Sequence, residues 1–317
     1  MLKFMDFCAG IGGGRLGLEA CGFSCVAHSE IDEPTSKVYT AIHNDNNNFG
    51  DLMKIEPKEL PNFDIMIAGF PCQTFSIVGK RGGFNDNRGL IINGLIKILK
   101  AKEVPFFILE NVKGLVNHNN GETFKIILDL LDDAGYDVFP SVLDSINFGV
   151  AQMRERIYLI GALKTLNIHF DFKNLETKAK TPLKNFIGHS TDILKNTQTL
   201  KKYLENKYNK NKHNLENILE KDYLILDTRQ SDLRLYENKV PTLRTGRHGI
   251  LYTKESKLYK LSPLEAFLLQ GFSKEHYERA LAQEYSATKL LSMAGNAMTV
   301  NVIKSIGGEL SYAISKK

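Results

Sequence analysis

The sequence predicts an α/β protein with a doubly wound, mostly parallel sheet and a second, smaller domain. Short apolar stretches alternate with helix-like stretches through the first half of the chain, an order typical of a parallel sheet covered by helices on both faces. A glycine-rich turn follows the first apolar stretch. With 317 residues, 43% hydrophobic and 24% charged, the chain is long enough for one large core and a smaller one.

The elements of the predicted sheet can be placed in order along the chain. The expected strands are short apolar runs bounded by turn residues, at 2–7, 24–29, 64–68, 105–109, 136–143 and 156–162. The expected helices show amphipathic periodicity, at 15–20, 34–43, 90–100, 123–134 and 294–312. We expect the last of these helices to pack back on the first domain.

The composition changes at about residue 167, where Lys- and Asn-rich sequence with weak periodicity begins. We therefore predict a first domain at 1–166, a second domain at 167–285 and a C-terminal segment at 286–317 that returns to the first. Residues 171–221 contain eleven lysines, six acidic residues and no arginine, a surplus equal to the whole net charge of +5. Such a surplus predicts either a polyanionic partner or a solvated insert.

The N-terminus and the cysteines predict the compartment. The first residues, MLKFMDFCAG, lack a basic region followed by an apolar stretch, and no apolar run reaches the roughly 20 residues of a membrane helix. We therefore expect a cytoplasmic protein without membrane contact, in which thiols stay reduced. Cys8, Cys21 and Cys25 are expected to be small buried residues. Their spacing lacks the paired ligands of a zinc site, so we expect no metal.

The glycine-rich turn predicts a nucleotide cofactor. Gly12, Gly14 and Gly17 form a GxGxxG pattern directly after a strand and at the start of a helix, where glycines let the backbone approach a ligand closely. Glu30 ends the next strand and could accept hydrogen bonds from ribose hydroxyls, and Asp51 could reach an adenine amine. The pattern predicts an adenosine cofactor without distinguishing NAD from S-adenosylmethionine, so an NAD-dependent oxidoreductase stays an alternative.

A second set of reactive residues follows the next strands. Cys72 lies in GFPCQTFS after the strand at 64–68, and Glu110 ends the strand at 105–109. Carboxyl ends of parallel strands share one edge of a sheet, so the two side chains could face one pocket. Arg154 and Arg156 alternate in QMRER, and alternation in an extended segment directs both guanidinium groups to one face.

These groups together suit methylation of cytosine at C5. That carbon is too poor a nucleophile to take a methyl group unaided, but thiolate attack at C6 loads electron density onto C5. A carboxylic acid at N3 stabilises the intermediate by donating a proton. The set therefore predicts covalent catalysis combined with general acid catalysis.

These motifs resemble the DNA cytosine-C5 methyltransferases of bacterial restriction–modification systems. The segments DFCAGIGGGRLGL, SEID and GDL resemble the first three family motifs, and GFPCQTFS resembles the catalytic motif. RGLI, ENV and QMRER follow in family order, and PTLRTGRHG, LSPLEAFLLQGF and GNAMTVNV resemble the closing motifs. The resemblance covers about 1–162 and 240–308. It implies the Rossmann-like fold of S-adenosylmethionine-dependent methyltransferases with a target-recognition domain.

The resemblance implies site residues one by one. Cys72 is the nucleophile, Glu110 assists at N3, and Arg154 and Arg156 hold the base and the catalytic turn. The residues expected around S-adenosyl-L-methionine are Phe7, Gly10, Ile11, Gly12, Gly13, Glu30, Ile31, Asp51, Leu52, Gly69, Pro71, Ile91, Asn296 and Ala297. Ile31 departs from the family, because an aromatic that stacks on adenine is usual there. The loop residues expected to contact DNA are Gln73, Ser76, Lys80, Arg81 and Arg88.

The second domain is expected to read the DNA. A cytosine inside a stacked duplex is inaccessible, so the target must be flipped into the pocket while another part of the protein reads base edges. Arg229 and Arg234 lie in the donor-rich segment DTRQSDLR, and Arg244 and Arg247 lie in LRTGRHG. A local salt-bridge network is the alternative role for these arginines.

The sequence therefore predicts a monomeric DNA (cytosine-5-)-methyltransferase acting on double-stranded DNA at the bacterial nucleoid. A cognate restriction endonuclease is expected from the resemblance alone. A tRNA cytosine-C5 methyltransferase shares the motifs and stays an alternative. A catalytically inactive DNA-binding module is a third possibility, although the nucleophile and the acid are both present.

Overall fold

The computed structural model describes residues 1–71, 90–175, 177–195, 198–246 and 248–316, which form two compact units. Unit 1 comprises Met1–Asp144, Glu155–Thr177 and Ala297–Lys317, and unit 2 comprises Ser145–Arg154 and Lys178–Asn296. Each unit has its own sheet and its own hydrophobic core.

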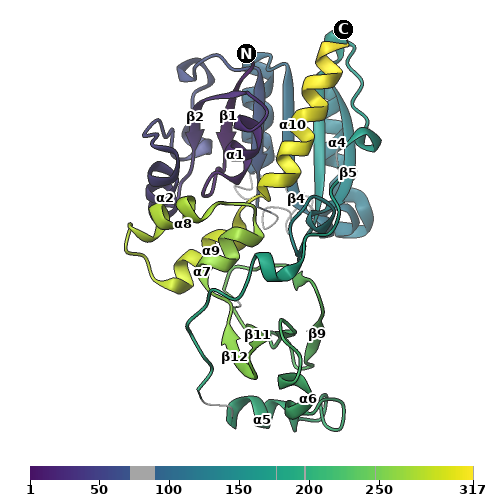
Figure 1. Cartoon of the computed structure of the whole chain (residues 1–317). Coiled ribbons are helices and arrows are strands. Elements are labelled where there is room, and N and C mark those ends of the chain that lie inside the picture. The colour runs from purple at the N-terminus through teal and green to yellow at the C-terminus, as the bar shows by residue number, and fades with distance from the viewer. Residues whose placement is uncertain (72–89, 176, 196–197, 247, 317) are drawn as a thin grey trace. The chain divides into compact units, whose positions relative to one another are not determined.

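Unit 1 is built on a six-stranded sheet in the order β2-β1-β3-β4-β7-β5, of which Figure 1 labels β1, β2, β4 and β5. Its strands are β1 (Lys3–Phe7), β2 (Ser24–Ser29), β3 (Ile65–Gly69), β4 (Phe106–Val112), β5 (Tyr136–Asp144) and β7 (Glu155–Leu163). The first four run parallel, and β7 is antiparallel to both of its neighbours. The predicted α/β fold with a mostly parallel sheet is thus confirmed. The direction of winding reverses between β1 and β3, the place where open α/β sheets bind ligands at the carboxyl ends of their strands.

Helices cover both faces of this sheet. They are α1 (Gly13–Glu19), α2 (Glu33–His43), α3 (Leu90–Lys102), α4 (Glu122–Asp133) and α10 (Val300–Ser315). Met5 and Phe7 of β1 share one core cluster with Leu95 of α3 and Ile127 of α4. Side chains alternate along a strand, and Ile67 of β3 on the other face lies next to Gly14 of α1.

Helix α10 returns to unit 1 and lies directly against α1 (Figure 1). A Cβ atom on Gly17 would lie 2.6 Å from Cβ of Ile303 and 2.8 Å from the carbonyl oxygen of Val300. The two backbones can approach this closely only because residue 17 has no side chain. The expected return of the last segment to the first domain is therefore achieved through a glycine contact.

The prediction of one helix at 294–312 is wrong. The structure has two helices there, α9 (Ala287–Asn296) and α10, and Thr299 before α10 has an extended backbone with φ −74° and ψ 117°. Ala294, Ala297 and Met298 are all buried, so the apolar pattern continues across the break and periodicity alone cannot reveal it. The chain passes from unit 2 to unit 1 at this break.

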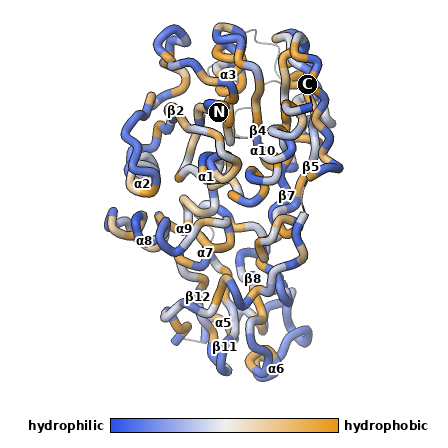
Figure 2. The backbone as a smooth tube through the Cα atoms, turned by 45° about the horizontal axis from the view of Figure 1, so that its top comes forward, coloured by the Kyte–Doolittle hydropathy of each residue, from blue (hydrophilic) through white to orange (hydrophobic). Residues whose placement is uncertain are grey.

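Unit 2 contains a two-stranded parallel sheet and a four-stranded antiparallel sheet in the order β12-β11-β8-β9. Its strands are β6 (Gln152–Met153), β8 (Ile225–Asp227), β9 (Arg234–Tyr236), β10 (Val240–Pro241), β11 (Ile250–Lys254) and β12 (Lys257–Lys260). Its helices are α5 (Gln198–Leu204), α6 (Leu215–Leu219), α7 (Pro263–Leu269), α8 (Lys274–Leu281) and α9. Around α5 and α6 the chain is mainly hydrophilic (Figure 2), and its few apolar side chains, such as Leu204 and Ile218, join Leu226 of β8 in a core.

The unit boundaries differ from the predicted domain boundaries. The division falls after residues 177 and 296, and residues 145–154 belong to unit 2. Residues 168–175 continue to pack on unit 1, since Asn174 donates a 3.0 Å hydrogen bond to Glu309 of α10. The composition changes at about residue 167, whereas the chain continues to pack on unit 1 up to residue 177, which explains why the predicted boundary falls too early. The functions assigned to the predicted domains stay predictions. Among the described residues, no helix has the length and apolar character needed to cross a bilayer.

The α1–α10 contact yields a test with a matched control. Gly17→Ala should lower the free energy of unfolding by about 1–3 kcal/mol, because the new methyl group forces two backbones apart. Gly308→Ala lies on α10, where a Cβ atom meets nothing within 4 Å, so it should be neutral or stabilising through its higher helix propensity. Urea unfolding of both variants measures the difference, and equal stabilities would show that the glycine contact is unimportant.

Candidate active site

The strand register of unit 1 brings Glu110 and Arg156 together. Gly69 of β3 pairs with Glu110 of β4, and Val112 pairs with Arg156 of β7. Nε of Arg156 lies 3.0 Å from Oε1 of Glu110, and the two side chains are 13% and 10% exposed. Two residues that lie far apart in the sequence therefore form a nearly buried ion pair at the carboxyl end of the parallel strands.

The Glu110 carboxylate is charge-paired but incompletely hydrogen-bonded. Its Oε1 is buried and accepts no hydrogen bond from any residue in the described ranges, although Nε of Arg156 lies only 3.0 Å away. A Cβ atom at Gly69 would lie 3.6 Å from Oε2, so the glycine leaves room beside the carboxylate. Buried polar atoms are almost always hydrogen-bonded, and an exception of this kind suggests a ligand.

Asn111 fixes the chain just before the predicted nucleophile. Its buried Nδ2 donates a 3.0 Å hydrogen bond to the carbonyl of Phe70, and its Oδ1 accepts from the backbone N–H of Val112 at 2.8 Å. Phe70 precedes Pro71 and Cys72 in the chain. Cys72 itself lies outside the described residues, as do Gln73, Ser76, Lys80, Arg81 and Arg88.

The other three cysteines are unsuited to nucleophilic attack. Each is only partly buried, so the prediction of buried residues is correct only in part, and none forms a disulfide with another described cysteine. Burial raises the pKa of Cys8 and that of Cys25 to about 12, and it also raises the pKa of Cys21. Since the thiolate is the reactive form, these three stay protonated at neutral pH. Cys72 is therefore left as the candidate nucleophile.

The turn after β1 is held by Glu30. The backbone N–H of Gly10, whose φ is +58°, donates to Oε2 of Glu30 at 2.8 Å, and the N–H of Asp32 donates to Oε1 at 2.8 Å. Burial raises the pKa of Glu30, and these backbone hydrogen bonds partly oppose the rise. The glycine turn and the end of β2 thus present one carboxylate with lone pairs still available.

Gly12 has no room for a side chain. Its φ is +81°, and a Cβ atom there would lie 1.9 Å from Nε2 of His43, which itself lies 3.2 Å from the carbonyl oxygen of Ile11. His43 of α2 therefore packs directly against the glycine turn. Nothing in the sequence singled out this histidine, because it lies 31 residues after Gly12.

Asn48 links the backbone of Glu30 to that of Gly50, the residue before Asp51, and the sequence did not identify it. Its Oδ1 accepts from the N–H groups of Glu30 and Gly50 at 3.0 and 2.9 Å, and its Nδ2 donates to the carbonyl of Glu30 at 3.0 Å. Asp51, which follows Gly50, accepts from the N–H of Met53. Asn48 lies in an asparagine-rich loop, where no feature distinguishes one asparagine from its neighbours.

These surroundings fit the adenosine part of S-adenosylmethionine. Ile31 is 71% exposed and offers an apolar face. A Cβ atom at Gly10 would meet nothing within 4 Å, so the backbone is open to a ligand, and Glu30 can accept from hydroxyls. Five further predicted cofactor residues are fully or nearly buried, namely Phe7, Ile11, Gly13, Leu52 and Ala297.

Two further predicted cofactor residues, Ile91 and Asn296, lie on helices. Ile91 is partly buried in the first turn of α3, beside the core of unit 1. Asn296 ends α9 and belongs to unit 2. Among the described residues, no group of three or more histidine, cysteine or acidic side chains is arranged to hold a metal ion.

Arg154 is anchored within unit 2. Its Nη1 donates to the carbonyls of Leu243 and Gly295 at 3.3 and 3.0 Å, and the side chain is almost fully buried. Gln152 holds the same segment, since its Oε1 accepts from the N–H of Leu243 at 2.9 Å. These two side chains fix the start of residues 243–249. Gln152 was part of the QMRER motif, but the sequence assigned it no role.

The arginines predicted to read DNA differ in their surroundings. Arg229 is 3% exposed and donates to both carboxylate oxygens of Asp227 at 2.7 and 2.8 Å and to the carbonyl of Thr242 at 2.7 Å. Arg234 is 46% exposed and pairs with Asp232. Arg244 is exposed, whereas Arg247 lies outside the described residues. The alternative of a local salt-bridge network therefore applies best to Arg229.

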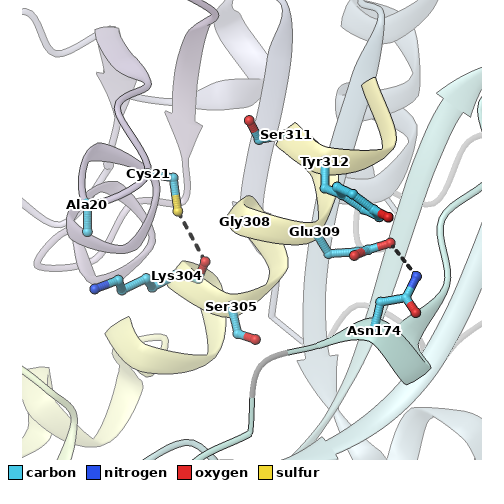
Figure 3. Close-up of a pocket in the computed structure, with 9 residues that line it drawn as sticks. All are labelled: Ala20, Cys21, Asn174, Lys304, Ser305, Gly308, Glu309, Ser311 and Tyr312. Atoms are coloured by element: carbon cyan, nitrogen blue, oxygen red, sulfur yellow. Dashed lines mark hydrogen bonds between the residues drawn. The ribbon is translucent and has the colours of Figure 1, made fainter. Parts of the chain in front are cut away.

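A separate pocket of about 660 Å³ lies at the other end of α1 (Figure 3). Lys304, Ser305 and Tyr312 of α10 line it, together with Cys21, whose thiol donates to the carbonyl of Lys304 at 3.1 Å. The pocket adjoins the C-terminal end of α1, whereas the turn at Gly10–Gly12 precedes its first residue. It is therefore distinct from the candidate active site.

The fold and the site together define a class. A parallel sheet with a glycine turn, a carboxylate at the end of β2 and a second carboxylate at the end of β4 is an α/β enzyme that binds a nucleotide cofactor at the strand ends. A family model described as C-5 cytosine-specific DNA methylase matches residues 2–312. The chain belongs to this family, whose members are S-adenosylmethionine-dependent DNA (cytosine-5-)-methyltransferases, and the resemblance seen in the sequence is confirmed.

Individual relatives support the assignment. The chain is 37% identical to the Type II methyltransferase M.HaeII of Haemophilus aegyptius, over 99% of this chain and 94% of the relative. It is 35% identical to the Type II methyltransferase M.BsuFI of Bacillus subtilis, over 98% of this chain and 72% of the relative. A crystal structure of a Spodoptera frugiperda DNMT2 mutant matches with a TM-score of 0.73 and 19% identity, covering 99% and 100% of the two chains. At that identity the likeness shows the fold alone.

The contrast between Arg229 and Arg234 can be tested by stability. Arg229→Ala should lower the free energy of unfolding by about 3 kcal/mol, because it leaves the buried Asp227 carboxylate without its partner. Arg234→Ala removes an exposed pair and should change stability by no more than about 0.5 kcal/mol. Urea unfolding measures both variants. If Arg229→Ala changed stability only slightly, the contact with Asp227 would be unimportant, and a role for Arg229 in reading bases would stay open.

Proposed function

We propose that this methyltransferase uses Cys72 and Glu110 to methylate C5 of a cytosine flipped out of duplex DNA. The observation that carries the proposal is the Glu110 carboxylate, which is buried beside Arg156 with an oxygen that accepts no hydrogen bond from the described residues. The chain reaches Cys72 three residues after Gly69, the strand partner of Glu110. We expect a pyrimidine ring bound beside Glu110 to be within reach of both the acid and the thiol.

The proposed reaction begins with bond formation between the Cys72 thiolate and C6 of the ring. Electron density moves to C5 as Glu110, protonated when the flipped cytosine is bound, donates that proton to N3. The Arg156 guanidinium, 3.0 Å from Glu110, stabilises the carboxylate formed when the proton leaves. C5 then takes the methyl group. Loss of the C5 proton to solvent, departure of Cys72 as thiolate and return of the N3 proton to Glu110 restore the aromatic ring and the starting enzyme.

The methyl donor is held by residues on the neighbouring part of the sheet edge. S-adenosylmethionine supplies an electrophilic methyl group when bound. We assign the ribose hydroxyls to Glu30, the adenine face to Ile31 and the adenine amine to Asp51. Asn48 keeps Glu30 and the segment before Asp51 in fixed positions through three hydrogen bonds. Gly10 and Gly12 allow the backbone to approach the ligand.

The relatives support a place in a restriction–modification system. M.HaeII and M.BsuFI are both named Type II methyltransferases, and we extend that role to this chain, with double-stranded DNA as substrate. A bacterial cytoplasmic location, a monomeric state and a cognate endonuclease remain predictions. Light scattering of the purified protein and the identity of the neighbouring gene test the last two.

Replacing the nucleophile tests the function. Cys72→Ser should lower transfer of labelled methyl groups from S-adenosylmethionine to plasmid DNA by about 10³-fold or more, the scale expected when a covalent nucleophile is lost. Cys21→Ser is the matched control, because its thiol has a raised pKa and lies in the separate pocket. It should keep activity within about twofold of the wild type.

Two outcomes would count against the proposal. Retained activity in Cys72→Ser would remove the covalent step. Transfer of label to a tRNA transcript, with none to plasmid DNA, would favour the tRNA alternative. If label enters DNA, bisulfite sequencing of the product identifies the methylated site.

A further inference from the structure

Unit 2 carries a group of exposed lysines that lie outside the residues proposed for catalysis, cofactor binding and base reading. We define the lysine segment as residues 201–212, which begin in α5 and continue through the following turns. It contains one acidic residue, Glu205, and five lysines, all of them exposed: Lys201, Lys202, Lys207, Lys210 and Lys212.

The charges of the lysine segment are not neutralised by the protein. Within the described ranges, the ion pairs of 4.0 Å or less in unit 2 include Lys221 with Glu237 at 2.7 Å and Lys260 with Asp192 at 3.1 Å. The same ranges contain no such pair for any of the five lysines of the segment. Like charges held close together repel one another, so an uncompensated group of this kind favours a polyanionic partner.

The segment is fixed in place, unlike a solvated insert. Asn209 is fully buried, and its Oδ1 accepts from the N–H of Leu233 at 2.7 Å while its Nδ2 donates to the carbonyl of Tyr203 at 2.9 Å. Asn206 donates to the carbonyl of Ser231 at 3.0 Å. A buried amide with its hydrogen bonds satisfied specifies one conformation.

The same contacts attach the lysines to the segment predicted to read bases. Tyr203 donates its hydroxyl to the carbonyl of Gln230 at 2.6 Å, and Ser231 and Leu233 receive the contacts from Asn206 and Asn209. Residues 230–233 lie between Arg229 and Arg234. Hydrogen bonds therefore hold the lysine segment and residues 230–233 together as one structural element of unit 2.

We propose that the lysine segment binds the phosphates of duplex DNA flanking the methylation site and adds affinity that does not depend on base sequence. The proposal rests on the proposed function, because it takes DNA as the partner. The segment contains lysine without arginine, and lysine offers a mobile point charge suited to phosphate, whereas arginine offers the fork that reads guanine. Tyr208, 45% exposed among the lysines, adds a hydroxyl of the kind that also contacts phosphates.

The test replaces all five lysines with glutamine, which keeps the side chains polar at exposed positions. The probe is a duplex of alternating A·T pairs, which contains no cytosine and so reports phosphate binding alone. For the wild type, log Kd should rise steeply with log salt concentration. In the fivefold variant this slope should fall by at least about 2, because each lost phosphate contact removes roughly 0.9. At low salt the affinity for the probe should fall by about tenfold or more.

The matched control is the double variant Lys221→Gln with Lys260→Gln, which removes ion-paired lysines from the same unit. Its slope should stay within about 0.5 of the wild type. An unchanged slope in the fivefold variant would overturn the proposal, and so would an equal loss in the control.

Methylation assays distinguish a failure of this inference from a failure of the proposed function. At saturating plasmid DNA the fivefold variant should keep its rate within about threefold, and bisulfite sequencing should show the same methylated sites as the wild type. A changed set of sites would overturn the proposal by giving the lysines a role in base reading. If the wild-type protein methylated no DNA, the proposed function would fail, whatever the slopes on the A·T duplex.

Discussion

The active site depends on the register of three neighbouring strands. Parallel pairing of β3 with β4 sets Gly69 opposite Glu110, and antiparallel pairing of β4 with β7 sets Val112 opposite Arg156. A shift of one residue would turn every side chain of a strand to the other face. The nearly buried contact between Glu110 and Arg156 therefore exists only because the surrounding core, with Phe107 and Leu109 fully buried, fixes that register. Asn111 extends the same constraint to the chain before Cys72.

The cofactor side of the sheet is organised by a different kind of constraint. There the constraint acts on the backbone conformation. Glycines adopt positive φ, and the Glu30 carboxylate accepts hydrogen bonds from backbone N–H groups. Such positions cost conformational freedom and are kept where a ligand must approach the main chain. His43 and Asn48 stabilise these conformations. His43 contacts the carbonyl oxygen of Ile11, and Asn48 accepts from the N–H of Glu30, so each acts from a segment distant in sequence. Both halves of the site are thus preorganised by groups that would not themselves touch a reacting atom.

Much of the fold and part of the site could be predicted from the sequence. Strand and helix alternation in unit 1 is encoded by strong local patterns. The sequence identified Glu110 and Arg156 as candidate site residues separately, but the contact between them is set by strand pairing and could not be predicted. The short strands of unit 2 could not be predicted, because elements of two to five residues leave too few positions for a periodic pattern. The break before α10 was hidden because Ala294, Ala297 and Met298 are buried on both sides of Asn296 and continue the apolar pattern. Arg229 looked like a base-reading residue because local sequence does not reveal that Asp227 and the carbonyl of Thr242 occupy its guanidinium group.

The coupling between Glu110 and Arg156 is the most direct test of the account. A double-mutant cycle with Glu110→Gln, Arg156→Gln and the double variant would measure kcat/KM for methyl transfer to DNA. If Arg156 acts by stabilising the carboxylate that Glu110 becomes, the double variant should be no slower than the more damaged single variant, a coupling of at least about 1.5 kcal/mol. Losses that simply multiply would show that the two side chains act independently, and the central claim would be contradicted.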